Sequence, residues 1–197
     1  MTIASDSDMN TDADTATDAD TNSFAIQDSQ LTSFEGLDKL AVIGGTISLQ
    51  SVEYPGEVSA FENLETVGGD FEFGDIFGDP IIFHFSEVAL TGFDSLSRVD
   101  GNFEIASNDG LKAVALPMLQ SIGGDFEISY NYALESLSLP NLIAVEGAYW
   151  GIESNQNLPN CLATAVFDNL NTGDPQSTCI SSNLADSCAD IEGGCDS

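Results

Sequence analysis

Glutamates occupy one recurring place in this chain, three residues after a glycine: Glu72, Glu104 and Glu127. A second polar set comes directly after the same glycines: Asp70, Asn102 and Asp125. Carboxylates held side by side can bind divalent cations or a basic partner, and a pair of carboxylates can hydrolyse a glycosidic bond. At about 5 Å, like charges repel by on the order of 1 kcal/mol per pair even in water. We therefore expect either a site for calcium or a basic partner, or an acidic surface that salt screens and that serves solubility.

Aromatic side chains form two further candidate contact surfaces. One cluster contains Tyr130, Tyr132, Tyr149 and Trp150. Exposed aromatic rings beside carboxylates suit stacking on sugars, although Trp150 equally suits a packing role in a repeat that is one residue longer than its predecessor. The other is an apolar stretch at residues 76–85, which includes Phe83 and Phe85. This stretch either carries a partner-binding patch or folds down over the edge of the repeats.

The elements that must position these side chains follow from an internal repeat. Gly101, Gly124 and Gly147 are each 23 residues apart, and two degenerate units precede them. After each glycine, apolar and polar residues alternate, which is typical of a strand with one buried face. A unit of this length cannot bury its apolar face alone and must stack on its neighbours. The sequence predicts a mainly β fold, a parallel β-solenoid of about five coils over residues 24–159.

Glycines and asparagines at fixed places in the repeat predict how the coils turn. The glycines either take a positive φ or let neighbouring coils approach closely. The asparagines are expected to form a ladder at one corner, where their amides bond backbone groups that the bend leaves unpaired: Asn108, Asn131 and Asn155. Between Gly69 and Gly101 the spacing expands to 32 residues, and this insertion contains the 76–85 stretch.

The repeat L-x-x-[VI]-x-G-x-[FI]-x-I-x-x-N-x-x-L-x-x-[VL]-x-L-P-x-L resembles the receptor L-domain family of leucine-rich-repeat-like β-helices. That family includes ligand-binding domains of receptor ectodomains, fungal wall-anchored proteins, and secreted or lipid-anchored bacterial surface proteins. The resemblance covers about residues 31–159 and is most specific between Leu96 and Asn155. It implies an extracytoplasmic, non-enzymatic module that binds a protein or glycan at the cell surface or has a structural role there. It carries no ligand-contact motif onto particular residues of this chain.

The C-terminal segment, residues 160–197, interrupts the repeat and contains all four cysteines: Cys161, Cys179, Cys188 and Cys195. Their spacing lacks the CxxC pairs of zinc sites, so we expect two disulfides and an oxidising compartment. Of the three pairings, we favour Cys161–Cys179 with Cys188–Cys195, because it closes short loops.

A helix is expected within the same segment. Asn160 is placed to cap it, and Gly173 to end it. Its apolar face would comprise Leu162, Ala163, Val166, Phe167 and Leu170. The segment therefore predicts a cap over the open apolar end of the solenoid.

The first 23 residues are acidic and almost free of apolar side chains, with Asp-x-Asp three times at a six-residue spacing. Such a segment cannot offset its ordering entropy, so we expect a disordered tether. It lacks the glycine and the terminal glutamate of an EF-hand loop. The chain shows no signal-peptide pattern and no apolar run long enough to cross a bilayer, so we expect no direct membrane insertion, and a signal or anchor outside this chain.

Charge narrows the function classes. The chain has 33 acidic residues against Lys39, Arg98 and Lys112, for a net charge of −30. This balance excludes nucleic acid and anionic lipid as partners. The single histidine, His84, has no Ser or Cys partner in a nucleophile motif. We expect a non-enzymatic binding or structural module. The alternatives are a carbohydrate-active β-helix enzyme with paired carboxylates and a calcium-dependent adhesion module, calcium being the one cofactor that the acids suggest. The sequence does not indicate an oligomeric state.

Overall fold

The computed structural model describes residues 23–30, 37–53, 61–74, 88–171, 177–186 and 191–193. These residues form a mainly β fold, a parallel β-solenoid of about five turns, which confirms the predicted fold class. The largest sheet has eight strands in the spatial order β1 (Phe24–Gln30), β3 (Ile47–Glu53), β5 (Phe71–Gly74), β8 (Phe103–Ala106), β11 (Phe126–Ser129), β14 (Tyr149–Glu153), β15 (Ser177–Ser181) and β16 (Ile191–Gly193). Its strands are parallel except for β16, which pairs antiparallel with β15.

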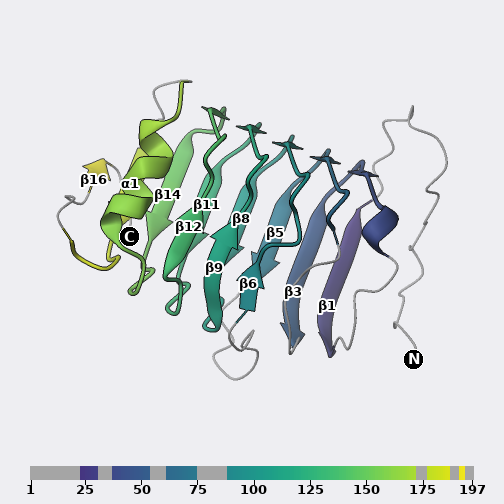
Figure 1. Cartoon of the computed structure of the whole chain (residues 1–197), viewed down its shortest axis with the longest axis horizontal. Helices are drawn as coiled ribbons and strands as arrows, with labels where there is room; N and C mark the ends of the chain where they lie inside the picture. The colour runs from purple at the N-terminus through teal and green to yellow at the C-terminus, as the bar shows by residue number, and fades with distance from the viewer. Residues whose placement is uncertain are drawn as a thin grey trace.

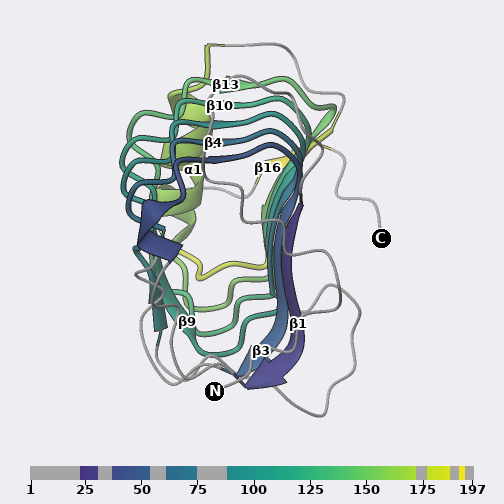
Figure 2. The ribbon, with the colours of Figure 1, turned by 90° about the vertical axis from the view of Figure 1, so that its right-hand side faces the viewer.

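Two smaller parallel sheets complete the turns. The five-stranded sheet has the order β13 (Ala144–Val145), β10 (Ser121–Ile122), β7 (Arg98–Val99), β4 (Thr66–Val67) and β2 (Val42–Ile43). The three-stranded sheet contains β12 (Ser136–Ser138), β9 (Leu111–Ala115) and β6 (Val88–Leu90). Strands of successive turns lie side by side along the long axis (Figure 1), and a view along that axis shows the sheets around one interior (Figure 2).

Stacked phenylalanines fill the interior behind the eight-stranded sheet. Phe71, Phe103 and Phe126 are register partners on β5, β8 and β11. Their ring centroids lie 4.8 Å and 5.6 Å apart, and all three side chains are buried. Burial of each such side chain contributes about 1.5–3 kcal/mol. The period-2 alternation therefore fixes which residues of these strands face the interior and which face outward.

Asparagines line one corner of the solenoid as a hydrogen-bonded ladder. Asn131 Oδ1 accepts the backbone N–H of Asn108 at 3.1 Å and its side-chain Nδ2–H at 2.9 Å. Asn155 Oδ1 accepts the same two groups of Asn131 at 3.0 Å and 3.2 Å. Asn183, which the repeat pattern did not reveal, continues the ladder beyond Asn155. These amides thus satisfy buried backbone groups at the bend, as a buried polar side chain must.

The cap differs in detail from the prediction. Helix α1 spans Asn160–Asp168 and packs against β12 and β15. Its N-cap residue is Pro159, and no side chain caps it, so the expected Asn160 cap was wrong. The helix also ends at Asp168, before Gly173. After it, the backbone N–H of Leu170 donates to the carbonyl of Phe167 at 3.1 Å, and that of Asn171 donates to the carbonyl of Ile143 at 2.9 Å.

The expected apolar face of α1 also needs a correction. Ala163 and Val166 are buried, and Phe167 and Leu170 pack against the core. Leu162 is 36% exposed. Leu162 is therefore not part of the buried face. A short 3-10 helix, η1 (Leu37–Lys39), lies near the opposite end of the stack (Figure 1).

Neither Cys161 on α1 nor Cys179 on β15 is a free thiol. The structure shows no bond between Cys161 and Cys179, so it does not support this predicted pair. Cys188 and Cys195 lie outside the described residues, so the second predicted pair stays a prediction. The acidic segment before residue 23 and the 76–85 insertion, with Phe83, His84 and Phe85, also lie outside the described residues.

Candidate functional site

The outward side of the eight-stranded sheet carries the acidic residues singled out from the sequence. Glu104 on β8 is the register partner of both Glu72 on β5 and Glu127 on β11. The structure therefore brings these three glutamates together, one per turn, at the spacing of roughly 4.8 Å between adjacent strands. We call Glu72, Glu104 and Glu127 the glutamate column.

A second ladder of hydrogen bonds links the turns directly before these strands. Asp70 Oδ1 accepts the backbone N–H of Asn102 at 2.7 Å, and Asn102 Oδ1 accepts that of Asp125 at 2.9 Å. Asp125 Oδ1 in turn accepts the backbone N–H of Tyr149 at 2.9 Å. Thr46 Oγ1 has the same role toward the backbone N–H of Asp70 at 3.2 Å. We call the acceptors Thr46, Asp70, Asn102 and Asp125 the acceptor ladder.

The acceptor ladder explains the repeat glycines. A Cβ atom on Gly101 would lie 2.3 Å from Asp70 Oδ1, and one on Gly124 would lie 2.3 Å from Asn102 Oδ1. At Gly147 the corresponding distance to Asp125 Oδ1 is 2.4 Å. These glycines are thus required for close approach between neighbouring turns, the second of the two roles expected from the sequence. Each glycine makes room for the acceptor of the preceding turn.

The acceptor ladder also changes the interpretation of the second polar set, which directly follows the glycines. Asp70, Asn102 and Asp125 each use one side-chain oxygen to satisfy a backbone N–H, and N–H donation to a carboxylate is charge-assisted. These polar side chains therefore stabilise the stacking of neighbouring turns. Sequence reasoning identified these residues only as neighbouring charges, although a short polar acceptor directly after each glycine was a visible signal.

In the described part of the chain, the glutamates of the column do not accept backbone N–H groups of a neighbouring turn, and two of them accept hydrogen bonds from side chains instead. Gln50 Nε2 donates to Glu72 Oε2 at 3.0 Å, and Ser129 Oγ donates to Glu127 Oε1 at 2.6 Å. Glu104 lies between these two. Burial raises the pKa of Glu104 from 4.5 to about 7, and the charges of Glu127, Glu72 and Asp70 add to the increase. Ionisation of the central glutamate therefore costs more free energy than that of an ordinary exposed glutamate.

Tyr149 limits the column on the C-terminal side. Gly151 is the register partner of Glu127, and the Tyr149 ring covers Gly151: a Cβ there would lie 2.4 Å from the Tyr149 hydroxyl oxygen. That hydroxyl donates to Glu153 Oε1 at 2.8 Å. Burial raises the pKa of Tyr149, and the hydrogen bond to Glu153 and the nearby charges raise it further. The phenol is therefore neutral and acts as a hydrogen-bond donor.

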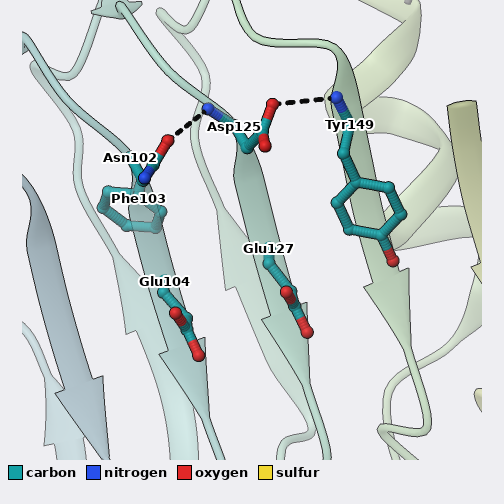
Figure 3. A pocket seen from close by; sticks show the side chains of 6 residues that line it. All are labelled: Asn102, Phe103, Glu104, Asp125, Glu127 and Tyr149. Carbon is teal, nitrogen blue, oxygen red and sulfur yellow. Dashed lines mark hydrogen bonds between the residues drawn. The ribbon is translucent and has the colours of Figure 1, made fainter. Parts of the chain in front are cut away.

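These side chains surround an open hollow across β8, β11 and β14. Its lining consists of Asn102, Phe103, Glu104, Asp125, Glu127 and Tyr149. In Figure 3 the glutamates of neighbouring strands lie parallel to each other, and the tyrosine ring stands on the next strand. The arrangement offers carboxylate groups and one aromatic ring on a sheet face rather than carboxylates that converge from opposite walls.

The other aromatic candidates divide into two groups. Trp150 is only 6% exposed, and its Nε1–H donates to the Gly147 carbonyl at 3.2 Å. Its ring therefore packs inside the fold and does not present a stacking surface. Tyr130 and Tyr132, which follow β11, are 47% and 43% exposed. Tyr130 lies close enough to Tyr149 to influence its ionisation, so it belongs to the edge of the same face.

The structure gives no support for a calcium site on this face. Among the described residues, no group of three or more Asp, Glu, His or Cys side chains is placed to hold one metal ion. Carboxylates spaced along a column, one per turn, do not surround a common point, whereas calcium takes six to eight oxygen ligands.

Comparisons with known proteins add no identification. No protein-family model matches the chain, and searches of curated proteins and of solved structures find no significant match. Within the described ranges, no helix combines the length and the apolar character that a membrane span requires. The fold itself therefore defines the class of protein, a repeat protein of the parallel β-solenoid type.

Proposed function

We propose that this protein is a non-enzymatic binding module of a secreted or surface-anchored protein, and that the outward face of the eight-stranded sheet contacts its partner. The observation that carries the proposal is the glutamate column. Glu72, Glu104 and Glu127 stand side by side on one face, and the pKa of Glu104 reaches about 7. Such an arrangement costs stability, so a binding role is a reason for its presence.

The resemblance to the receptor L-domain family supports the same proposal. The asparagine ladder and the glycines that admit the acceptor ladder give the repeat motif a physical basis. Solenoid sheets offer extended surfaces that suit macromolecular partners. A protein or a glycan at the cell surface is the partner class that this resemblance implies. An extracytoplasmic location also agrees with Cys161 and Cys179 not being free thiols.

One observation favours a second candidate, a carbohydrate-active enzyme. Glu104 has a pKa of about 7, as a general acid requires, and Glu127 lies on the adjacent strand. Retaining glycosidases place their two carboxyl groups about 5–5.5 Å apart. The parallel alignment of the two side chains on an open face argues against this candidate, since catalytic carboxylates flank the scissile bond from both sides.

One set of binding and activity assays distinguishes the binding module from the enzyme. The protein is incubated with soluble polysaccharides and with extracellular-matrix proteins, and both binding and product release are measured. Binding without turnover, with protection from hydrogen exchange in β8 and β11, supports the module. Release of sugar that is lost in Glu104→Gln and retained in Glu135→Gln, an exposed glutamate before β12, supports the enzyme. Protection confined to the other two sheets would contradict the proposed face.

A further inference from the structure

A buried serine extends the glutamate column toward the N-terminus. Ile47 and Leu49 of β3 face the core, so Ser48 between them lies on the outward side, where it is the register partner of Glu72. Ser48 is only 5% exposed, and its hydroxyl has no hydrogen-bond partner among the residues that the structure describes. A buried hydroxyl without a partner carries a desolvation cost. It is a group that a bound ligand would satisfy.

We propose that the row from Ser48 through Glu72 and Glu104 to Glu127 binds lysine or arginine side chains of an extended segment of a partner protein. This inference rests on the proposed function and names the chemistry of the partner. The row combines three carboxylates that accept hydrogen bonds with one hydroxyl oxygen that can do the same. Ammonium and guanidinium groups donate hydrogen bonds and carry the opposite charge.

Within the part of the chain that the structure describes, no lysine or arginine lies on the strands of the eight-stranded sheet, which form this face. Lys39 lies in η1 and Lys112 on β9 of another sheet. Arg98, on β7, contacts the carboxylate of Asp100. With a net charge of −30 on the whole chain, the counter-charge for the row must come from solution or from a partner.

The dimensions of the row favour a polypeptide over a metal ion. Three steps between neighbouring strands separate Ser48 from Glu127, which corresponds to about 14 Å. Side chains on one side of an extended segment repeat every 6.6–7 Å or so, so two or three basic side chains span the row. The described residues contain no cluster of side chains that could hold a metal ion.

The aromatic edge of the face fits the same partner. Tyr130 is exposed beyond the end of β11, and the ring of Tyr149 lies over Gly151 next to Glu127. A cation near a tyrosine ring gains attraction from the ring face, and arginine does so more often than lysine. The end of the row at Glu127 therefore suits a guanidinium group.

The test is calorimetric titration of the full chain with a peptide of alternating lysine and serine, and with a neutral peptide in which glutamine replaces lysine. Each carboxylate contact in a half-buried site is worth on the order of a factor of five in affinity. We expect Glu104→Gln/Glu127→Gln to weaken binding of the lysine peptide by about tenfold or more. The matched control Glu135→Gln/Glu146→Gln removes the same charge from exposed positions beside β12 and β13, and should change binding less than twofold.

Two further readouts separate a specific site from diffuse attraction. Ser48→Ala should weaken binding while raising Tm, because it removes a buried hydroxyl without a partner. Binding at pH 6.5 should release protons, seen as different heats in buffers of different ionisation enthalpy, because a cation favours ionised Glu104. The Glu104→Gln variant should lose this proton release.

Several results would overturn the inference. Equal weakening in the two double variants would mean that only net charge matters. Equal affinity for spermidine would show that any polycation suffices. Absence of lysine-peptide binding at 150 mM salt, with hydrogen-exchange protection of β8 and β11 by a matrix protein or polysaccharide, would refute the partner class and leave the proposed function intact. Absence of both would refute both.

Discussion

Replacing Glu104 with glutamine should stabilise the protein at pH 8 and not at pH 4.5. The folded state raises the pKa of Glu104 from 4.5 to about 7, first through burial and then through the charges of Glu127, Glu72 and Asp70. Between these two pH values the folded state binds more protons than the unfolded state, so stability falls as pH rises through this window. Below pH 4.5 the carboxyl is neutral in both states and carries no penalty. Above about pH 7 the full penalty is present.

The magnitude follows from the shift and from the exposure of the side chain. A change from 4.5 to about 7 corresponds to on the order of 3 kcal/mol for a fully buried group. Because Glu104 is only half-buried, solvent screening reduces the penalty to about 1–2 kcal/mol. In a chain of this size, 1 kcal/mol shifts Tm by about 2–4 °C. Glu104→Gln should therefore raise Tm by about 2–8 °C at pH 8.

The assay is thermal unfolding of wild type, Glu104→Gln and Glu135→Gln at several pH values from 4.5 to 8.5, at one ionic strength. Glu135 is exposed before β12, so its substitution changes net charge equally without touching the column. The difference between the two variants isolates the local environment of Glu104 from the repulsion that a net charge of −30 creates across the whole chain. Equal stabilisation by both variants, or a Glu104→Gln effect that persists at pH 4.5, would refute the reasoning.

Three other predictions test the ladders and the cap. Gly124→Ala should destabilise the fold by about 3 kcal/mol or more in urea unfolding, because the added Cβ meets Asn102 Oδ1 at 2.3 Å and the Asn102 backbone nitrogen at 2.8 Å. Without this clash the substitution would raise stability by about 0.4–1 kcal/mol, because alanine lowers the entropy of the unfolded chain, so unchanged or increased stability would contradict the close approach. Asn131→Ala should cost about 3 kcal/mol, since it removes the acceptor of the buried Asn108 N–H and a donor to the Ile105 carbonyl, whereas Asn141→Ala, at an exposed amide, should cost under 1 kcal/mol. Reduction of the intact protein should lower Tm by several degrees if the predicted disulfides close the C-terminal segment, and alkylation of four thiols without prior reduction would contradict those bridges.

The sequence was sufficient for features that repeat at constant spacing. The alternation around Phe103 and Phe126 correctly separated inward from outward residues, so the register of Glu104 with Glu127 could be predicted from the repeat. Because side chains alternate between the two faces of a strand, burial of one face fixes the register between neighbouring strands. The asparagines of three successive turns were visible for the same reason.

The sequence was insufficient where the period changes or where several backbone acceptors compete. Asn183 follows Asn155 by 28 residues because α1 replaces a strand of the small sheet in the last turn, so a fixed period of 23 does not find it. α1 ends at Asp168, and the chain that follows it bonds to the Ile143 carbonyl, a partner distant in sequence. The acceptor ladder was missed because the same Asp side chain fits a charged surface and a backbone acceptor equally well until the neighbouring turn is placed.

The two acidic sets on this face differ in whether a backbone N–H is available to donate a hydrogen bond to the carboxylate. Asp70 and Asp125 lie just before their strands, and each short side chain reaches a backbone N–H of the next turn. Glu104 lies two residues after Asn102, the member of the acceptor ladder in its own turn. It is within β8, where the backbone N–H groups already pair in the sheet. A carboxylate there gains no backbone donor, is half-buried, and faces like charges on both sides. Glutamine at this position would keep the size of the side chain and remove the repulsion. Since folding would be favoured by that exchange, the fold alone does not account for the glutamate, and this is the reason for proposing a cationic partner.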